Sequence, residues 1–180
     1  GYDKNKTRVK DLKKFIDTNN EFNKEDFKLK KDSLITSNKN DLRDANFYIV
    51  TVPTPIKKNK VPDLKYIKDA FNLISRYIKN DDIVFLESTV FPGTTENICK
   101  NIIQKNNKNI KFHIGYSSER INPGDKIHNI RNICKVVSIK NNKKIIKSVK
   151  KIYECVSKKV VFTEKIKETE LSKLIENTQR

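Results

Sequence analysis

The sequence contains no methionine and no tryptophan, and only four of its 180 residues are glycine. Because it has no initiator methionine, we expect it to be a piece of a longer protein. It also has no Gly-rich loop of the G-x-G-x-x-G type, which cradles the phosphates of a dinucleotide. No apolar run is long enough to cross a bilayer, and nothing resembles a signal peptide. These absences predict a protein with no membrane partner.

Cysteine is scarce and unpaired. Cys99, Cys134 and Cys155 are an odd number with no paired spacing, which excludes a disulfide framework and predicts a reducing, cytoplasmic setting. The two histidines, His113 and His128, show no metal-ligand spacing, so we predict no metal site.

Acidic residues are outnumbered, with 39 Lys and Arg against 22 Asp and Glu, for a net charge of +17. Such a charge indicates a nucleic-acid partner, an anionic small ligand, or a compositional drift in which lysines accumulate on solvated faces without a binding role. The lysines are spread along the whole chain and form no stripe. We therefore favour drift, with anionic small molecules second, and predict no nucleic-acid partner. A basic nucleic-acid-binding module remains an alternative.

Apolar runs alternate along the chain with segments of helical periodicity, and the length suffices for one domain with a real core. We expect the end of a strand at 1–3, a short strand at 33–36 and further strands at 46–56, 83–89, 112–115, 134–139 and 158–164. Helices are expected at 4–17, 63–79, 94–105, 143–156 and 166–180, and a short helix or turn at 40–45. This alternation predicts an α/β fold with a doubly wound parallel sheet. Residues 1–165 would form an incomplete nucleotide-binding domain, and residues 166–180 would begin a long linking helix.

The segment Tyr116–Asp125, YSSERINPGD, follows the short apolar run at 112–115. Glu119 would then lie just past the carboxyl end of a strand, where open α/β sheets bind ligands. The alternative is an ordinary turn in which Glu119 and Arg120 are solvated.

Two earlier strands end in similar polar segments. In the run 46–56, Pro53 and Pro55 end the strand and hold Thr54 extended between them. After the strand at 83, Ser88 and Thr89 precede a helix that Thr94 or Thr95 can cap, and such a helix start suits a phosphate or a bound cofactor. The alternatives are a rigid strand exit in the first case and a buried hydroxyl pair with a structural cap in the second.

Two further positions are ambiguous by themselves. Asp3 is either a helix cap or an acid that binds an adenosine ribose. Lys173 and Asn177 share one face of the last helix, although an exposed lysine is common on any helix. We expect Leu171, Leu174 and Ile175 to form the apolar side of that helix.

The segments IVTVPTP, ESTVFPGTTE and YSSERINPGD, in this order and spacing, resemble the UDP-glucose/GDP-mannose dehydrogenase family, and ENTQR at the end belongs to the same pattern. The resemblance covers essentially the whole chain and is greatest to the bacterial UDP-N-acetylhexosamine 6-dehydrogenases. It implies a Rossmann-like sheet that lacks its first βα unit. It also implies oxidation of the carbon-6 alcohol of a UDP-sugar to a carboxylate with two NAD, in a protein that is a homodimer when complete. We expect the chain by itself to be inactive. UDP-glucose oxidation and a non-catalytic remnant remain alternatives.

The resemblance also implies roles for individual residues. Asp3 would bind the adenosine ribose and Arg8 would lie beside the adenine. Glu119 would be the acid/base at the sugar, Lys173 would stabilise oxyanions, and Asn177 would orient the substrate. The remaining NAD contacts implied are Val52, Pro53, Thr54 and Pro55 along the dinucleotide and Ser88, Thr89 and Val90 near the nicotinamide, with Thr89 also catalytic. The remaining substrate contacts implied are Arg120, Ile121 and Asn122.

The sequence departs from the family pattern at several points. Ser118 replaces a proline usual in the acetamido-sugar branch, and Pro123 stands where the UDP-glucose branch has a second glutamate. The second departure argues against UDP-glucose as substrate. The nucleophilic cysteine of the family lies beyond Arg180, and none of the three cysteines here replaces it.

Overall fold

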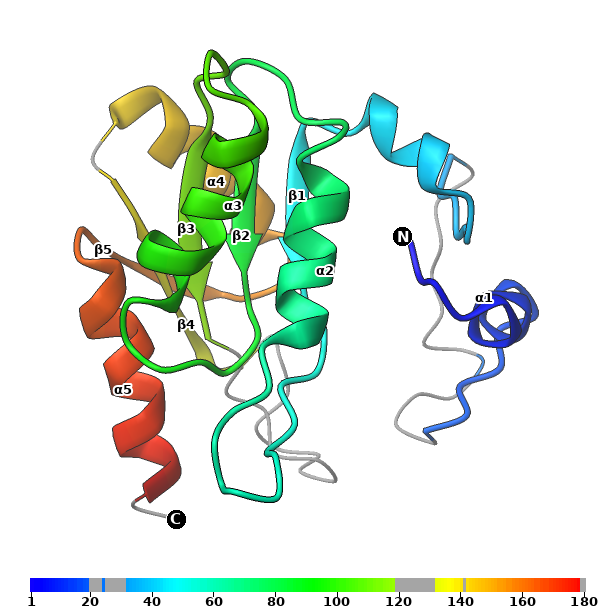
Figure 1. Cartoon of the computed structure of the whole chain (residues 1–180), viewed down its shortest axis with the longest axis horizontal. Coiled ribbons are helices and arrows are strands. Elements are labelled where there is room, and N and C mark those ends of the chain that lie inside the picture. The colour runs from blue at the N-terminus through cyan, green and yellow to red at the C-terminus, as the bar shows by residue number, and fades with distance from the viewer. Residues whose placement is uncertain (20–23, 25–31, 119–131, 141, 179–180) are drawn as a thin grey trace. The chain divides into compact units, whose positions relative to one another are not determined.

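The computed structural model describes residues 1–19, 24, 32–118, 132–140 and 142–178 (Figure 1). The chain divides into two compact units, Gly1–Ala45 and Asn46–Arg180. None of the helices in these described ranges is long and apolar enough to cross a membrane.

The first unit contains helix α1, Lys6–Lys13, and the 3-10 helix η2, Lys39–Asp44. Asn5 caps α1, because its side chain accepts hydrogen bonds from the backbone of the first turn. Tyr2 and Thr36 form a parallel bridge, which confirms that two extended segments lie side by side here. The helix α1 is shorter than the predicted 4–17.

The second unit is built on a five-stranded sheet in the order β1-β2-β3-β4-β5. Its strands are β1 Phe47–Val50, β2 Ile83–Leu86, β3 His113–Ser117, β4 Cys134–Ile139 and β5 Lys159–Thr163. The pairs β1-β2, β2-β3 and β4-β5 are parallel, with Phe47 opposite Ile83 and Ile83 opposite His113. The prediction of an α/β, Rossmann-like fold is confirmed.

One pairing departs from a purely parallel sheet. β4 runs antiparallel to β3, with Tyr116 opposite Ser138. The sheet is therefore mostly parallel, and β4 and β5 run against the other three strands. Runs of apolar residues carry no information on strand direction, so this reversal was not predicted.

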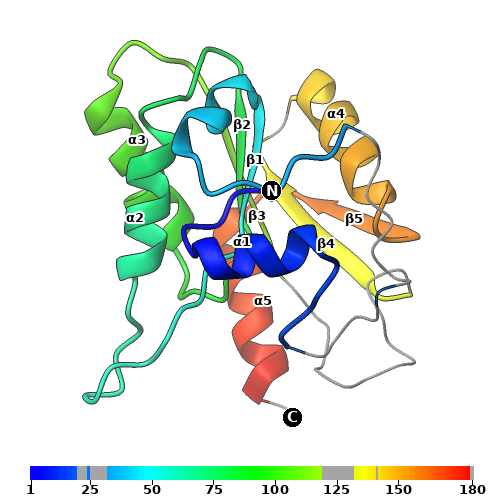
Figure 2. The same ribbon diagram turned by 90° about the vertical axis from the view of Figure 1, so that its right-hand side faces the viewer.

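Helices cover both faces of the sheet. In Figure 2, α2 and α3 lie on one face and α4 on the other, while α5 packs against β3 and β4. The helical segments are α2 Lys65–Ile74, the π-helix η3 Thr94–Cys99, α3 Lys100–Asn106, α4 Lys143–Glu154 and α5 Ile166–Thr178.

The core beneath α4 is built from every second residue of the strands, because successive side chains of a strand point to opposite faces of the sheet. Alternate residues of β2 and β4 meet the apolar stripe of α4 in one cluster. Its buried members are Ile83, Phe85, Val137, Ile139, Ile145, Val149 and Tyr153. Gly115 of β3 passes close to this cluster, and a Cβ there would overlap the Phe85 ring and lie 2.8 Å from the Ser138 carbonyl oxygen.

The edge strand β1 is less buried than its apolar sequence suggests. Tyr48 and Val50 are buried, whereas the side chain of Ile49 is 45% exposed. One face of this strand is therefore buried, and the other is covered only in part, by the packing of Phe47 against Phe85.

Candidate functional site

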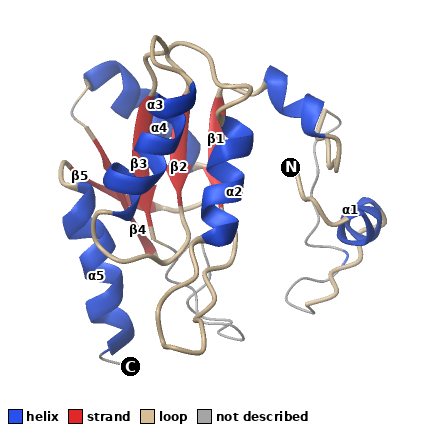
Figure 3. Ribbon diagram, in the orientation of Figure 1, coloured by secondary structure: helices blue, strands red, loops and turns tan. Residues whose placement is uncertain are grey.

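The carboxyl ends of β1, β2 and β3 lie together, because these three neighbours are parallel. The connections that follow β1 and β2 leave the sheet at that common edge (Figure 3). Ligands of open α/β sheets bind outside this edge. It is therefore where the predicted strand-end residues are brought together.

The exits of β1 and β2 are joined by a side chain. Ser88 is buried, and its hydroxyl donates a hydrogen bond of 2.5 Å to the carbonyl oxygen of Val52. The hydroxyl oxygen of Thr54 is also buried and has no hydrogen-bond partner in the described part of the chain. A polar atom left without a partner costs free energy unless a ligand or water satisfies it. Thr54 is thus a candidate ligand contact.

The residues after β2 alternate in exposure. Ser88 and Val90 are buried, whereas Thr89 between them is exposed. The backbone therefore directs the Thr89 side chain away from the core at this edge. Its hydroxyl is open to a ligand, while its two neighbours fix the position of the chain.

The start of η3 is capped differently from the prediction. Gly93 precedes η3 with φ +91°, a conformation that favours glycine. Neither Thr94 nor Thr95 caps the helix with its side chain, and Thr94 instead donates to the carbonyl oxygen of Phe91. The backbone N–H groups of Gly93 and Thr95 donate to the carboxylate of Glu170 on α5.

Lys173 lies inside the protein. It is 6% exposed, and its Nζ is 3.9 Å from a carboxylate oxygen of Glu176. The alternative of an ordinary solvated lysine is therefore wrong. Asn177 lies one turn further along α5, and its side chain is outside the described residues.

The residues predicted to form the apolar side of α5 are only partly covered. Leu171 and Ile175 are 45% and 51% exposed, whereas Thr169, Glu170 and Lys173 are buried. The helix thus buries these three polar side chains as well as Ile166 at its start, while Leu171 and Ile175 lie on its outer side. A buried charge requires partners, so this face indicates a site rather than simple packing.

The predicted substrate segment lies outside the described residues: Glu119, Arg120, Ile121 and Asn122. Ser118, which precedes it at the end of β3, is buried. Its hydroxyl oxygen has no hydrogen-bond partner in the described ranges. The carboxyl end of β3 thus offers a second buried polar atom without a partner at the same edge.

A buried ion pair lies next to Ser88 and was missed by the sequence analysis. The Nζ of Lys135 on β4 is 3.0 Å from one carboxylate oxygen of Glu87, and the Tyr153 hydroxyl donates to the other at 2.7 Å. Lys135 is 1% exposed, and its Nζ is 5.8 Å from the centroid of the Tyr153 ring. The sequence signal for this ion pair was the presence of a lysine, Lys135, inside the apolar run CKVVSI.

The pKa values of two buried side chains, a cysteine and a tyrosine, are raised by burial and by the carboxylates near the site. Burial, followed by the negative charge of Glu170, raises the pKa of the Cys99 thiol to about 12. The pKa of Tyr116 is raised by burial and, to a lesser extent, by Glu170 and Glu87. Both groups remain protonated at neutral pH. Because the thiolate is the nucleophile, Cys99 is excluded as one.

The predicted adenosine contacts lie in the first unit. Asp3 is exposed, accepts a hydrogen bond from the Asn5 backbone at 2.8 Å, and lines a cavity of about 430 Å³. Arg8 forms an ion pair with Asp17 at 3.0 Å and donates to the Thr18 hydroxyl at 2.7 Å. Asp3 thus precedes α1, whereas Asn5 is its cap.

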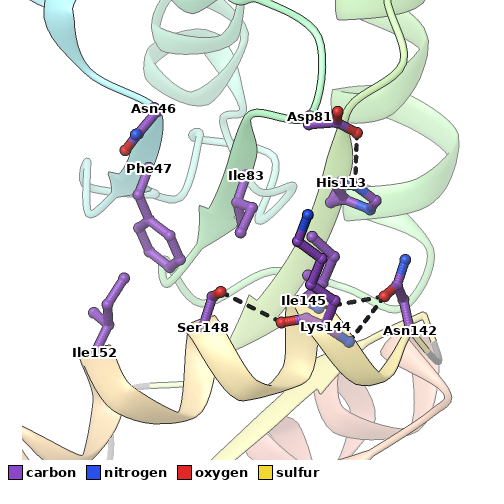
Figure 4. Close-up of a pocket in the computed structure, with 10 residues that line it drawn as sticks. All are labelled: Asn46, Phe47, Asp81, Ile83, His113, Asn142, Lys144, Ile145, Ser148 and Ile152. Atoms are coloured by element: carbon purple, nitrogen blue, oxygen red, sulfur yellow. Dashed lines mark hydrogen bonds and ion pairs between the residues drawn. The ribbon is translucent and has the colours of Figure 1, made fainter.

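A second cavity, of about 360 Å³, lies at the amino ends of the parallel strands beside α4 (Figure 4). Asp81 and His113 approach each other there, with 3.7 Å between Oδ1 and Nε2. No predicted site residue lines this cavity, and it lies at the edge opposite to the strand ends discussed above. Within the described residues, no group of three or more His, Cys, Asp or Glu side chains could hold a metal ion.

The strand-end edge presents polar groups from two neighbouring connections. The unpartnered Thr54 oxygen and the exposed Thr89 hydroxyl offer hydrogen bonds from two neighbouring strands. The Ser88 bond to Val52 fixes these two exits relative to each other. This edge can therefore hold an extended polar ligand that crosses both strand ends.

Comparisons with known proteins agree with this arrangement. The model of the NAD binding domain of the UDP-glucose/GDP-mannose dehydrogenase family matches residues 1–157. The chain is 40% identical to a UDP-N-acetyl-D-glucosamine 6-dehydrogenase of Salmonella typhi and 42% identical to Protein CapL of Staphylococcus aureus. Each match covers the whole chain, which spans 43% of each relative.

A solved structure shares the fold. The UDP-glucose dehydrogenase of the hyperthermophilic archaeon Pyrobaculum islandicum superimposes with a TM-score of 0.85 at 20% identity, over 99% of this chain and 43% of that one. The family match covers most of the sequence, and the sheet is of the Rossmann-like type. The chain therefore belongs to the UDP-glucose/GDP-mannose dehydrogenase family, and its residues 1–157 match the NAD binding domain of that family.

Proposed function

We propose that the protein oxidises the carbon-6 alcohol of a UDP-N-acetylhexosamine to the uronic acid, with NAD as the oxidant. The observation that supports this most is the buried Lys173 on α5, a helix that Glu170 ties to the exit of β2. The similarity to relatives named for N-acetylglucosamine and N-acetylmannosamine favours an acetamido sugar.

The cofactor would lie along the exits of β1 and β2, held by Val52 to Pro55 and by Ser88 to Val90. Bound NAD would accept the hydride that leaves carbon 6. Asp3 and Arg8 would bind its adenosine end. The Ser88 bond to Val52 keeps the two exits in register, so that the Thr89 hydroxyl is presented at a fixed position.

The protein's own side chains would handle protons and charge. Glu119 would accept the proton of the alcohol, because loss of hydride from carbon requires loss of a proton from oxygen. Lys173 would stabilise the developing oxyanion, since a fixed cation in a water-poor site acts more strongly than in bulk water. Arg120, Ile121, Asn122 and Asn177 would orient the sugar.

The test uses the full-length protein, because the chain spans less than half of its relatives. NADH formation is measured by absorbance with UDP-N-acetylglucosamine, UDP-N-acetylgalactosamine and UDP-glucose. Two NADH per acetamido sugar are expected. Lys173→Met is expected to lower kcat by about 10² to 10³-fold, and Glu119→Gln by about 10² to 10⁴-fold.

Lys147→Met is the matched control, since Lys147 is an exposed lysine of α4. Faster turnover of UDP-glucose than of either acetamido sugar would reassign the substrate. A folded full-length protein that turns over no UDP-sugar would refute the enzyme and leave a non-catalytic remnant.

We also propose a homodimer in which the outer side of α5 takes part. The exposed Leu171 and Ile175 support it, because they are one turn apart and form an apolar strip. A cytoplasmic setting is proposed as well, supported by the free thiols of Cys99, Cys134 and Cys155.

A further inference from the structure

Glu170 is a fully buried carboxylate with three hydrogen-bond donors around it. Gly93 N donates to Oε2 at 2.5 Å, and Thr95 donates to Oε1 through its backbone N–H at 2.9 Å and its hydroxyl at 2.7 Å. Glu170 is 0% exposed. All three donors come from residues more than seventy positions earlier in the chain, so these bonds are tertiary contacts.

The donors require a carboxylate rather than an amide. Both oxygens of Glu170 accept, one from Gly93 and the other from Thr95. A glutamine has only one acceptor oxygen, and its NH₂ group would face a backbone N–H. The negative charge also lies at the start of a helical segment, where the unpaired N–H groups favour an anion.

These contacts connect the two proposed catalytic elements. Gly93 and Thr95 closely follow Thr89 at the exit of β2. On the other side of the contact, Lys173 is three residues after Glu170 and therefore shares its face of α5. The segment 88–95 is therefore held at both ends, by the Ser88 bond to Val52 at one end and by the bonds of Gly93 and Thr95 to Glu170 at the other.

We propose that Glu170 is a positioning residue that holds Lys173 at a fixed place relative to Thr89. This inference rests on the proposed function, because it gives Lys173 and Thr89 their roles. Glu170 touches neither substrate nor cofactor. It acts by fixing α5 against the backbone that carries Thr89.

A carboxylate that only stabilised the fold would lower the melting temperature and leave turnover of the folded protein unchanged. A positioning residue acts on the transition state, so its loss lowers kcat and leaves KM nearly constant. Misplacement of a catalytic group by about 1 Å can reduce a rate by roughly 10²-fold.

The experiment compares Glu170→Gln, Glu170→Asp and Glu168→Gln in the full-length protein, well below the melting temperature of each. Glu168 is the matched control, because it lies on the same helix and its exposed carboxylate pairs only locally with Lys165. Glu170→Gln is expected to lower kcat by about 10 to 100-fold, with KM for the UDP-sugar within about 3-fold. Glu170→Asp should recover part of the loss, and Glu168→Gln should behave as the wild type.

A milder variant covers the case in which Glu170→Gln does not fold. Thr95→Val removes one donor, keeps the shape of the side chain, and is expected to lower kcat by about 3 to 10-fold at constant KM. If the folded variants keep kcat within about 2-fold of the wild type, or change only KM, the inference is overturned.

Hydrogen exchange gives a readout that does not need turnover. Glu170→Gln is expected to speed exchange both at residues 88–95 and in α5 around Lys173, because one contact holds both. Faster exchange at 93–95 alone would overturn the inference. An inactive wild type would refute the proposed function, whereas the exchange result would still decide whether Glu170 couples the two elements.

Discussion

At the scale of single residues, the carboxylate of Glu87 takes its hydrogen-bond and charge partners from within the protein. Lys135 and Tyr153 occupy its two carboxylate oxygens at 3.0 and 2.7 Å. Removing one member of a buried ion pair leaves the other charged and poorly solvated, which destabilises a protein strongly. The pair lies one residue from Ser88 and supports the strand exit from the α4 side of the sheet.

We therefore expect Lys135→Ala to lower the free energy of unfolding by about 3 to 5 kcal/mol. The measurement is the shift in thermal unfolding followed by circular dichroism. Lys150→Ala is the comparison, because Lys150 forms an exposed ion pair with Glu154 at 3.6 Å. That change should alter stability by less than about 0.5 kcal/mol. Equal effects of the two substitutions would show that the buried pair contributes no more than a surface pair.

Sequence reasoning selected Lys173, which the structure buries, but could not predict the burial of Lys135 or Glu170. Motif resemblance identified Lys173. The burial of Lys135 arises only when β2, β4 and α4 come together, and a lysine in a short apolar run is equally typical of a half-exposed strand. Contacts between distant segments are invisible to local patterns.

At the scale of elements, α5 has its polar side inward. Thr169, Glu170 and Lys173 face the sheet, while Leu171 and Ile175 face outward. Apolar periodicity predicted which residues form the apolar side but not which side is buried, although the apolar side of a surface helix usually faces the core. By contrast, the apolar run CKVVSI predicted both ends of β4 correctly. The predicted end of α2 was less accurate, because the helix ends at Ile74 instead of near Lys79.

The outward apolar strip gives a prediction for assembly. We expect the double substitution Leu171→Lys and Ile175→Lys to convert a dimer of the full-length protein into a monomer, because burying two ammonium groups in an interface is costly. Light scattering after size-exclusion chromatography measures the mass. Val156→Lys changes an apolar residue of similar exposure, 38%, outside α5 and should leave the mass unchanged. A double variant that remains dimeric would rule out this strip as an interface.

At the scale of the whole molecule, buried acidic groups predict how stability depends on pH. Burial, followed by the charge of Asp82, raises the pKa of Tyr48 from 10.0 to about 12. The pKa of Cys99 rises from 9.0 to about 12. Below pH 9 the folded and unfolded states both keep these protons, so their stabilising effect is complete. Above it the unfolded state ionises first and is favoured.

We therefore expect the melting temperature to fall as the pH rises from about 9 towards 12. The double variant Tyr48→Phe, Cys99→Ala should show a shallower fall, because it cannot lose those two protons. Tyr66→Phe is the control and should keep the slope of the wild type. Identical slopes for all three proteins would mean that other groups govern the alkaline transition.

The sheet as a whole was predictable in class but not in direction. Alternating strand and helix patterns identified the α/β fold, and polar residues after the apolar runs predicted which edge of the sheet carries the candidate site. Cys134–Ile139 has the same kind of apolar sequence as β2, yet it pairs with β3 in the antiparallel sense. The distinction depends on how the intervening chain returns, which the strand itself does not encode.

That reversal has a consequence for the segment that contains Glu119. Because β4 is antiparallel to β3, the chain leaves the sheet after Ser117 and returns before Cys134 at the same edge. Both anchors are set by neighbouring strands, and the register of Ser117 with Val137 does not depend on what lies between them. Substitutions in the connection can therefore change its contacts while the scaffold stays intact. Under the proposed function, a change in the choice of sugar would therefore not require a change in the sheet.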